Sequence, residues 1–166
     1  MSTPLTIRKY KPEDAGGICA LYNYYVGHTT ATFDTEPLSD GTMRRRLDSI
    51  AADYPCLVAV APDGGIAGYA YAHRWKERDA YVTTAETTIY LHPHYHRNGI
   101  GRRLMTELAG RCRAAGIHTL IACLTAENES SCRFHENIGF VRVSYFREVG
   151  RKFNRWLDIA DYQLVL

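Results

Sequence analysis

The residues best suited to chemistry surround two glycines, Gly99 and Gly101, in the stretch His96-Arg97-Asn98-Gly99-Ile100-Gly101-Arg102. Glycines one residue apart let the chain turn tightly and expose its backbone N–H groups. A helix starting here would add unpaired N–H donors and the positive end of its dipole. The spacing therefore predicts an anion cradle for a phosphate-bearing ligand, reinforced by Arg97 and Arg102.

Two common phosphate-binding loops do not fit this spacing. A P-loop needs Lys and then Ser or Thr after its second glycine, whereas two arginines follow Gly101. A dinucleotide-binding loop needs a third small residue, but that position is Leu104. A dinucleotide-binding loop also follows the first strand of its βαβ array, whereas this turn lies past the middle of the chain. A ligand bound here would therefore be another kind of phosphate compound, and the alternative is an ordinary strand-to-helix turn without a ligand.

Glu86 is the candidate for proton transfer. It lies among Thr83, Thr84, Thr87 and Thr88 in the run that leads into the glycine turn. A carboxylate in a largely apolar strand is costly unless it is paired or functional. Partial burial would raise its pKa toward the working pH. The alternative is an exposed Glu on an edge strand.

A third pattern is the run His92-x-His94-x-His96. In an extended strand, alternation would place the three imidazoles on one side, as in some metal sites. Pro93 interrupts such a strand, and no carboxylate is close in sequence. We therefore expect no metal and interpret these histidines as neighbours of bound phosphates.

The elements that must position these residues follow from the composition and the hydrophobic pattern. With 46% hydrophobic and 23% charged residues, the 166 residues fit one globular domain, 1–166. Strand patterns occupy 5–9, 57–61, 66–73, 81–91, 120–125, 140–145 and 156–165. Helix patterns occupy 12–27, 39–53, 101–115 and 130–139. This order predicts an α/β fold, a mixed sheet with helices on both faces.

Composition also bounds the partners. A net charge of +2 argues against a nucleic-acid surface, and Arg44–Arg46 fit the solvated face of a helix. No stretch has the length of a signal peptide core or a membrane span. Five cysteines without a Cys-x-x-Cys pair indicate reduced thiols in the cytoplasm.

The chain resembles the GCN5-related N-acetyltransferases (GNAT). Residues 96–101 are similar to their motif A, Gln/Arg-x-x-Gly-x-Gly/Ala, and residues 128–140 resemble their motif B. His96 departs from the usual Gln or Arg, and Arg97 beside it can supply the lost donor. The element order extends the resemblance over nearly the whole chain. It implies the single-domain acyl-CoA N-acyltransferase fold, with acetyl-CoA as co-substrate.

The resemblance also implies roles for individual residues. Backbone groups of Tyr90, Leu91 and His92 would pair with the pantetheine arm like an added strand, and one N–H would serve as oxyanion donor. Asn128 matches a position that contacts the arm or the pyrophosphate. The pyrophosphate would lie against Arg97, Asn98, Gly99, Ile100, Gly101 and Arg102.

His135 stands where the broad family has a Tyr that protonates the thiolate, counting back from Gly139-Phe140. A histidine there could donate that proton or act as a second base beside Glu86. Both roles remain open, as does a surface histidine without a role.

Further segments resemble the phosphinothricin / methionine sulfoximine N-acetyltransferase branch. These segments are Thr29–Phe33, Gly68–Tyr71, Arg74–Tyr81, Glu86–Tyr90 and His135-Glu136. The branch implies acetylation of the α-amine of a small amino acid that carries a phosphinate, sulfoximine or sulfone, and a homodimer with the pocket at its interface. The implied substrate residues are Phe33, Arg74, Trp75, Lys76, Arg78 and Tyr81.

Two other functions stay open. The chain could bind acetyl-CoA as a sensor without turnover, or acetylate another amine, such as a polyamine, an aryl-amine or a protein N-terminus. The presence of both Glu86 and His135 favours an enzyme.

Overall fold

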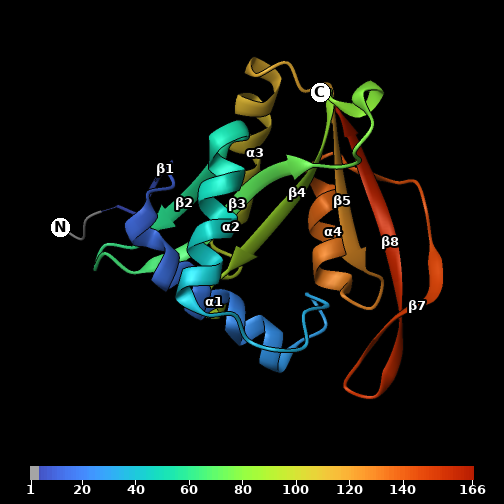
Figure 1. The fold of residues 1–166 in the computed structure, drawn as a ribbon, viewed down its shortest axis with the longest axis horizontal. Coiled ribbons are helices and arrows are strands. Elements are labelled where there is room, and N and C mark those ends of the chain that lie inside the picture. Colours follow the sequence, from blue (N-terminus) through green and yellow to red (C-terminus); the bar gives the residue numbers. More distant parts are fainter. Residues whose placement is uncertain (1–3) are drawn as a thin grey trace.

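The computed structural model describes residues 4–166, whose strands form one mixed sheet (Figure 1). The strand order is β1-β2-β3-β4-β5-β8-β6, and β7 pairs with β8. In the described chain β4 and β5 are parallel, whereas the other neighbouring strands are antiparallel. The strands are β1 Thr6–Lys9, β2 Cys56–Val60, β3 Ile66–Arg74, β4 Thr84–Leu91, β5 Thr119–Thr125, β6 Val141–Arg142, β7 Phe146–Lys152 and β8 Arg155–Val165.

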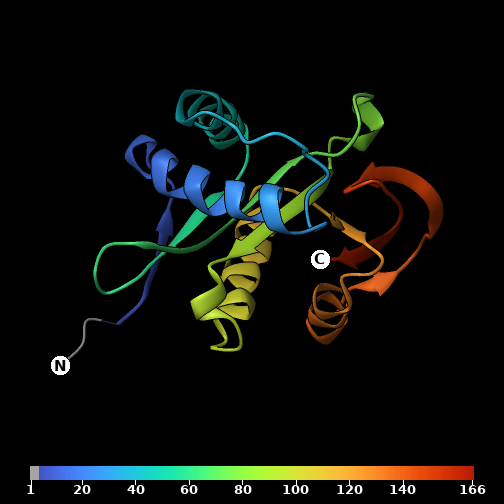
Figure 2. The same cartoon turned by 90° about the horizontal axis from the view of Figure 1, so that it is seen from below.

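In residues 4–166, the α-helices α1 to α4 cover the two faces of this sheet (Figure 2). α1 (Ala15–His28) and α2 (Asp40–Asp53) lie on one face, and α3 (Ile100–Ala114) and α4 (Glu129–Asn137) lie on the other. The expected α/β class with helices on both faces is confirmed. Between residues 4 and 166, no helix combines the length and apolar character needed to cross a bilayer.

Alternation along β3 explains how the sheet serves both helix layers. Tyr69 and Tyr71 belong to the core under α1 and α2, whereas Ala70 and Ala72 belong to the core under α3. Successive side chains of a strand point to opposite faces, so one strand contributes to both cores. The small alanines leave room for α3 to approach the sheet closely.

The expected elements differ from the structure mainly near the C-terminus. The strand expected at 140–145 is limited to Val141–Arg142, and β7 was not expected. β7 and β8 are joined by Phe153 and Asn154, which have φ of 50° and 60°. Such paired positive φ values usually call for Asn-Gly or Asp-Gly, so Phe153 concealed the turn. β4 begins at Thr84 instead of 81, because Asp79–Tyr81 form a 3-10 turn.

Candidate active site

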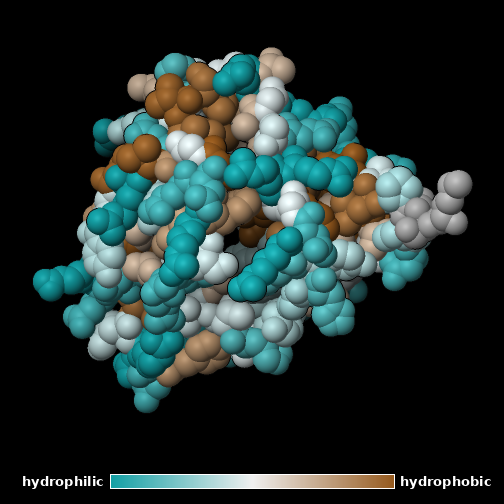
Figure 3. Space-filling model, turned by 180° about the vertical axis from the view of Figure 1, so that it is seen from behind, coloured by the Kyte–Doolittle hydropathy of each residue, from teal (hydrophilic) through white to brown (hydrophobic). Residues whose placement is uncertain are grey.

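β4 and β5 pair at one end only. Their ladder joins Thr84–Glu86 to Thr119–Ile121, and beyond it the strands diverge. The opening contains a cavity of about 830 Å³. Figure 3 shows a hollow on the face that carries α3 and α4. The sequence-predicted site residues that line the cavity are Phe33, Glu86, Tyr90, Leu91, Arg97, Asn128 and His135.

The backbone of β4 supplies the free edge of this opening. The N–H of His92 donates to the carbonyl of Ala67 on β3 at 2.8 Å. Alternate residues of an antiparallel strand direct their backbone groups to opposite sides, so Tyr90 faces β3 as His92 does. Ile89 and Leu91 direct theirs toward the cavity. A ligand that pairs with this edge would therefore meet the backbone of Ile89 and Leu91, whereas the backbone groups of Tyr90 and His92 face β3.

The N-terminus of α3 lies where the sequence predicts the anion cradle. Gly99 precedes the helix with φ of 73°, and Arg97 also has a positive φ, 64°. Among the described residues, no backbone carbonyl accepts a hydrogen bond from the N–H groups of residues 97–102. A Cβ on Gly99 would meet nothing within 4 Å, so the space beside it is open. A Cβ on Gly101 would lie 3.2 Å from Leu91, so this glycine lets the helix pack against β4.

The histidine run 92–96 is not an extended strand, because Pro93–Tyr95 form a 3-10 turn. Nε2 of His96 lies 3.1 Å from the hydroxyl of Tyr25 and 3.3 Å from the carbonyl oxygen of Leu91. Burial raises the pKa of Tyr25 to about 12, so its hydroxyl stays protonated and donates to Leu91. In residues 4–166, no group of three or more His, Cys, Asp or Glu is arranged to hold a metal ion. Tyr25 lines the cavity, and no local sequence signal marked it.

Glu86 lies where β4 and β5 begin to separate, with its side chain 30% exposed. Burial raises the pKa of its carboxyl group, His73 opposes that shift, and Asp161 adds to it. His73 lies directly opposite on β3, with Nε2 3.8 Å from Oε1 of Glu86. A partly buried carboxylate with a raised pKa is suited to taking a proton near neutral pH.

His135 is buried in α4, with 1% of its surface exposed. Its Nδ1 lies 2.8 Å from the carbonyl oxygen of Ser131. A carbonyl only accepts, so Nδ1 carries the hydrogen, and Nε2 of the neutral ring keeps its lone pair. Burial lowers the pKa of His135, which favours this neutral form. The ring is therefore arranged to accept a proton at Nε2.

α4 is held at both ends by residues expected in the cofactor site. Asn128 caps its N-terminus, where Oδ1 accepts the N–H of Ser131 at 3.3 Å. Arg102 on α3 donates to the carbonyl of Asn137 at 3.1 Å. These contacts fix the helix that carries His135 relative to the cradle.

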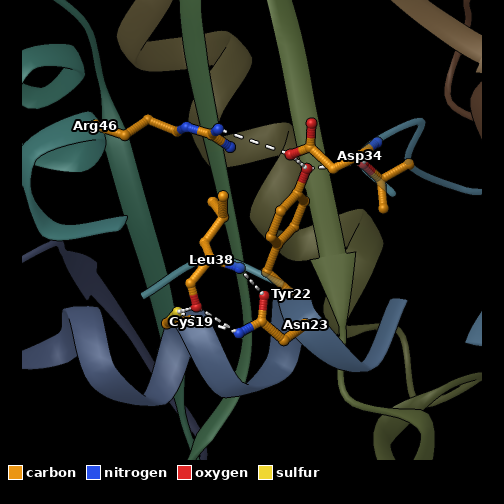
Figure 4. Close-up of polar contacts among 7 residues, drawn as sticks. Cys19, Tyr22, Asn23, Asp34, Leu38 and Arg46 are labelled. Carbon is orange, nitrogen blue, oxygen red and sulfur yellow. Dashed lines mark hydrogen bonds and ion pairs between the residues drawn. The ribbon is translucent and has the colours of Figure 1, made fainter. Parts of the chain in front are cut away.

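The loop 29–39 connects α1 to α2, and its residues Ala31, Thr32 and Phe33 line the cavity. Lys152 on β7 is buried and donates from Nζ to the carbonyl of Thr32 at 2.8 Å. Tyr90 on β4 donates to the carbonyl of Ala31 at 3.3 Å. The loop is thus tied to both halves of the sheet. Figure 4 shows its other anchors, which join Asn23 and Cys19 to Leu38, and Tyr22 and Arg46 to Asp34.

Most residues expected to contact substrate lie outside this cavity. Phe33 lines it, but Arg74, Trp75, Lys76, Arg78 and Tyr81 do not. Nζ of Lys76 lies 4.3 Å from the ring centre of Trp75 and 5.4 Å from that of Tyr81. These residues form a surface cluster that begins at the last residue of β3, not a wall of the cavity.

Comparisons with known proteins agree with this geometry. Residues 7–160 match the family model for an acetyltransferase (GNAT) domain. The phosphinothricin N-acetyltransferase of Streptomyces coelicolor is 39% identical over 160 residues, which cover 95% of this chain and 94% of that one. The L-methionine sulfoximine/L-methionine sulfone acetyltransferase of Salmonella typhimurium is 34% identical, over 98% and 95%. A phosphinothricin acetyltransferase from Sinorhizobium meliloti, solved in complex with acetyl-CoA, gives a TM-score of 0.94 at 35% identity, covering 100% of this chain and 89% of that one.

Proposed function

This chain belongs to the GNAT acetyltransferase family, and we propose that it transfers the acetyl group of acetyl-CoA to the α-amine of a small amino acid analogue. The acceptor class is an amino acid with a tetrahedral phosphinate, sulfoximine or sulfone, such as phosphinothricin, methionine sulfoximine or methionine sulfone. The named relatives act on these compounds, which supports the proposal. Residues 1–166 would form a single N-acetyltransferase domain.

The observation that carries this proposal is the opening between β4 and β5. It has the α3 cradle near one end and Glu86 near the other. Leu91 lies five positions after Glu86 in extended strand, a length of about 17 Å. A long ligand can therefore bind its phosphates at the cradle and present its far end to the carboxylate.

The residues of the opening fit acetyl-CoA. The unpaired N–H groups of residues 97–102 suit a pyrophosphate, and a Cβ at Gly99 would occupy only open space. The edge at Ile89 and the N–H of Leu91, whose carbonyl is taken by Tyr25, suit the amide groups of a pantetheine arm. Asn128, at the start of α4, lines the same cavity. When bound, acetyl-CoA supplies an activated acyl thioester.

Glu86 is the proposed general base. Its carboxylate takes a proton from the acceptor ammonium, directly or through one water, and frees the nitrogen lone pair for attack. The backbone N–H of Ile89 or Leu91 donates to the carbonyl oxygen that gains charge during attack. Because burial raises the pKa of Glu86, the carboxylate is a stronger base than an exposed Glu.

His135 is the proposed second proton acceptor. Its Nδ1 is committed to the carbonyl of Ser131, and its lowered pKa keeps Nε2 unprotonated at neutral pH. This geometry supports the base role and disfavours proton donation to the leaving thiolate.

The acceptor pocket is proposed to form in a homodimer. Phe33 walls the pocket within one protomer, whereas Arg74, Lys76 and Arg78 lie outside it. A second copy could bring these cations, with Trp75 and Tyr81, to the carboxylate and tetrahedral oxygens of the acceptor. Five free thiols support a cytoplasmic location for the enzyme. We propose a small-molecule acceptor and no nucleic-acid or membrane partner.

One assay tests this function. Acceptor-dependent thiol release from acetyl-CoA is measured with methionine sulfoximine, phosphinothricin, a polyamine, an aryl-amine and a peptide N-terminus. We expect release with the first two. Acetyl-CoA binding without release for any amine would instead identify a sensor, and release with the peptide alone would identify a protein N-terminal acetyltransferase.

A further inference from the structure

We propose that His73 is a positioning residue for Glu86: its protonated ring holds the carboxylate ionised, and its neutral ring accepts the proton that Glu86 takes from the acceptor amine. This inference rests on the proposed function, because it concerns the same proton transfer. It adds a role for a β3 residue that no sequence motif marked.

The geometry of the pair sets the direction of transfer. His73 and Glu86 are register partners across the β3–β4 ladder, with Nε2 and Oε1 3.8 Å apart. Nδ1 of His73 lies 3.0 Å from the carbonyl oxygen of Arg74. Because that carbonyl only accepts, Nδ1 is the donor, and the lone pair of the neutral ring lies on Nε2, toward Glu86.

The other titratable groups around Glu86 do not offer this role. Burial raises the pKa of Cys123 on β5 to about 12 and also raises the pKa of Tyr71 on β3, so both stay protonated. Asp161 on β8 is a second carboxylate, which disfavours ionised Glu86. In the described part of the chain, His73 is therefore the group facing Glu86 that can carry a positive charge.

The proton balance closes without a further reagent. The N–H bond of the acceptor ammonium breaks and an O–H bond forms on Glu86. That O–H bond then breaks and an N–H bond forms at Nε2 of His73, leaving an imidazolium beside a carboxylate. The His73 side chain is 32% exposed, so the imidazolium can release the proton to water. The 3.8 Å gap requires a small rotation or one bridging water.

The test compares His73→Ala, His73→Lys and His118→Ala, with His118 as an exposed histidine outside the cavity. We expect kcat of His73→Ala at pH 7 to fall about tenfold and its acid limb to move up by about one pH unit. The reason is that the variant lacks both the neutral ring that takes the proton from Glu86 and the imidazolium that keeps Glu86 ionised. The KM for acetyl-CoA should not change. His73→Lys should keep the acid limb at or below its wild-type pH, because it keeps the charge.

Imidazole in the buffer separates proton transfer from a structural effect. It should raise kcat of His73→Ala and leave His118→Ala unaffected. A wild-type acid limb in His73→Ala, or no response to imidazole, would overturn the inference. If His73→Ala does not fold, the acid limb and the response to imidazole are measured on His73→Gln instead. Failure of the wild-type protein to release thiol with any acceptor would instead refute the proposed function.

Discussion

Gly150 on β7 lies directly against the ring of Phe33, and a Cβ at this position would overlap three ring carbons. Phe33 belongs to the loop that follows α1, so the contact joins segments from the two ends of the chain. The glycine is required here by packing, because its φ is not positive. A contact between distant segments thus sets the wall of the proposed acceptor pocket.

Gly150→Ala tests this wall. The added methyl group must displace the Phe33 ring, so we expect the KM of methionine sulfoximine to rise about tenfold. Acetyl-CoA affinity should stay at its wild-type value, because the cradle is untouched. Gly110→Ala on α3 is the control, since its Cβ meets nothing within 4 Å. The KM of both variants is measured by steady-state kinetics. An unchanged acceptor KM in Gly150→Ala would show that Phe33 does not form part of the acceptor pocket.

Glu86→Gln tests the general base. The amide cannot take a proton from the acceptor ammonium, so we expect kcat to fall by roughly 10²–10⁴-fold. The Kd of acetyl-CoA, measured by calorimetry, should stay within about twofold of wild type. The reason is that the substitution removes a proton transfer made during the reaction, not a contact that binds acetyl-CoA. Wild-type turnover with a wild-type pH–rate profile would disprove the assignment.

His135→Phe tests the second proton acceptor. The variant fills the same volume but lacks Nε2, so we expect kcat to fall about 10²-fold with intact acetyl-CoA binding. In the wild type, burial lowers the pKa of His135. Its neutral form should therefore persist at pH values at which an ordinary imidazole is already protonated. Loss of acetyl-CoA binding in the variant would show that the ring is structural.

Asp161→Asn tests the electrostatics around Glu86. Asp161 raises the pKa of Glu86, so its removal should lower that pKa and move the acid limb of kcat to lower pH. The asparagine can still accept the hydroxyl of Ser144, a contact of 2.9 Å in the wild type. Asp158→Asn on the same strand is the control, and its acid limb should match the wild type. A shift to higher pH in Asp161→Asn would contradict the assignment.

Gly99→Ala tests the cradle. A side chain at φ 73° costs roughly 1–2 kcal/mol and would enter the space offered to phosphate. We expect the Kd of acetyl-CoA to rise about tenfold, measured by calorimetry. Gly116→Ala is a matched control, since it has φ of 86° at the other end of the same helix and open space around it. If both variants lost acetyl-CoA affinity equally, the effect would come from backbone strain alone, and the cradle assignment would be contradicted.

Local sequence patterns were sufficient to predict the order of most elements and the position of the Gly99–Gly101 turn. Helix and strand periods, the Ser39 cap and the Gly99–Gly101 turn depend on residues near one another in the chain, so local pattern is sufficient to read them. Glu86 and His135 were identified because a carboxylate in an apolar strand and a histidine at a fixed distance from Gly139-Phe140 are local features. Phe153 hid the β7–β8 turn because its positive φ is unusual for that residue type.

The tertiary structure alone decided which groups meet at the site. The alternation of side chains predicts which residues of β4 point to each face of the sheet. It does not predict which strand pairs with each edge of β4. Only the β3 ladder shows that the backbone groups of Leu91, and not those of His92, face the cavity. The hydroxyl of Tyr25 and the imidazole of His73 reach their partners from elements far away in sequence. Such contacts arise from packing and strand register, which fix the distances between residues that the chain itself keeps far apart.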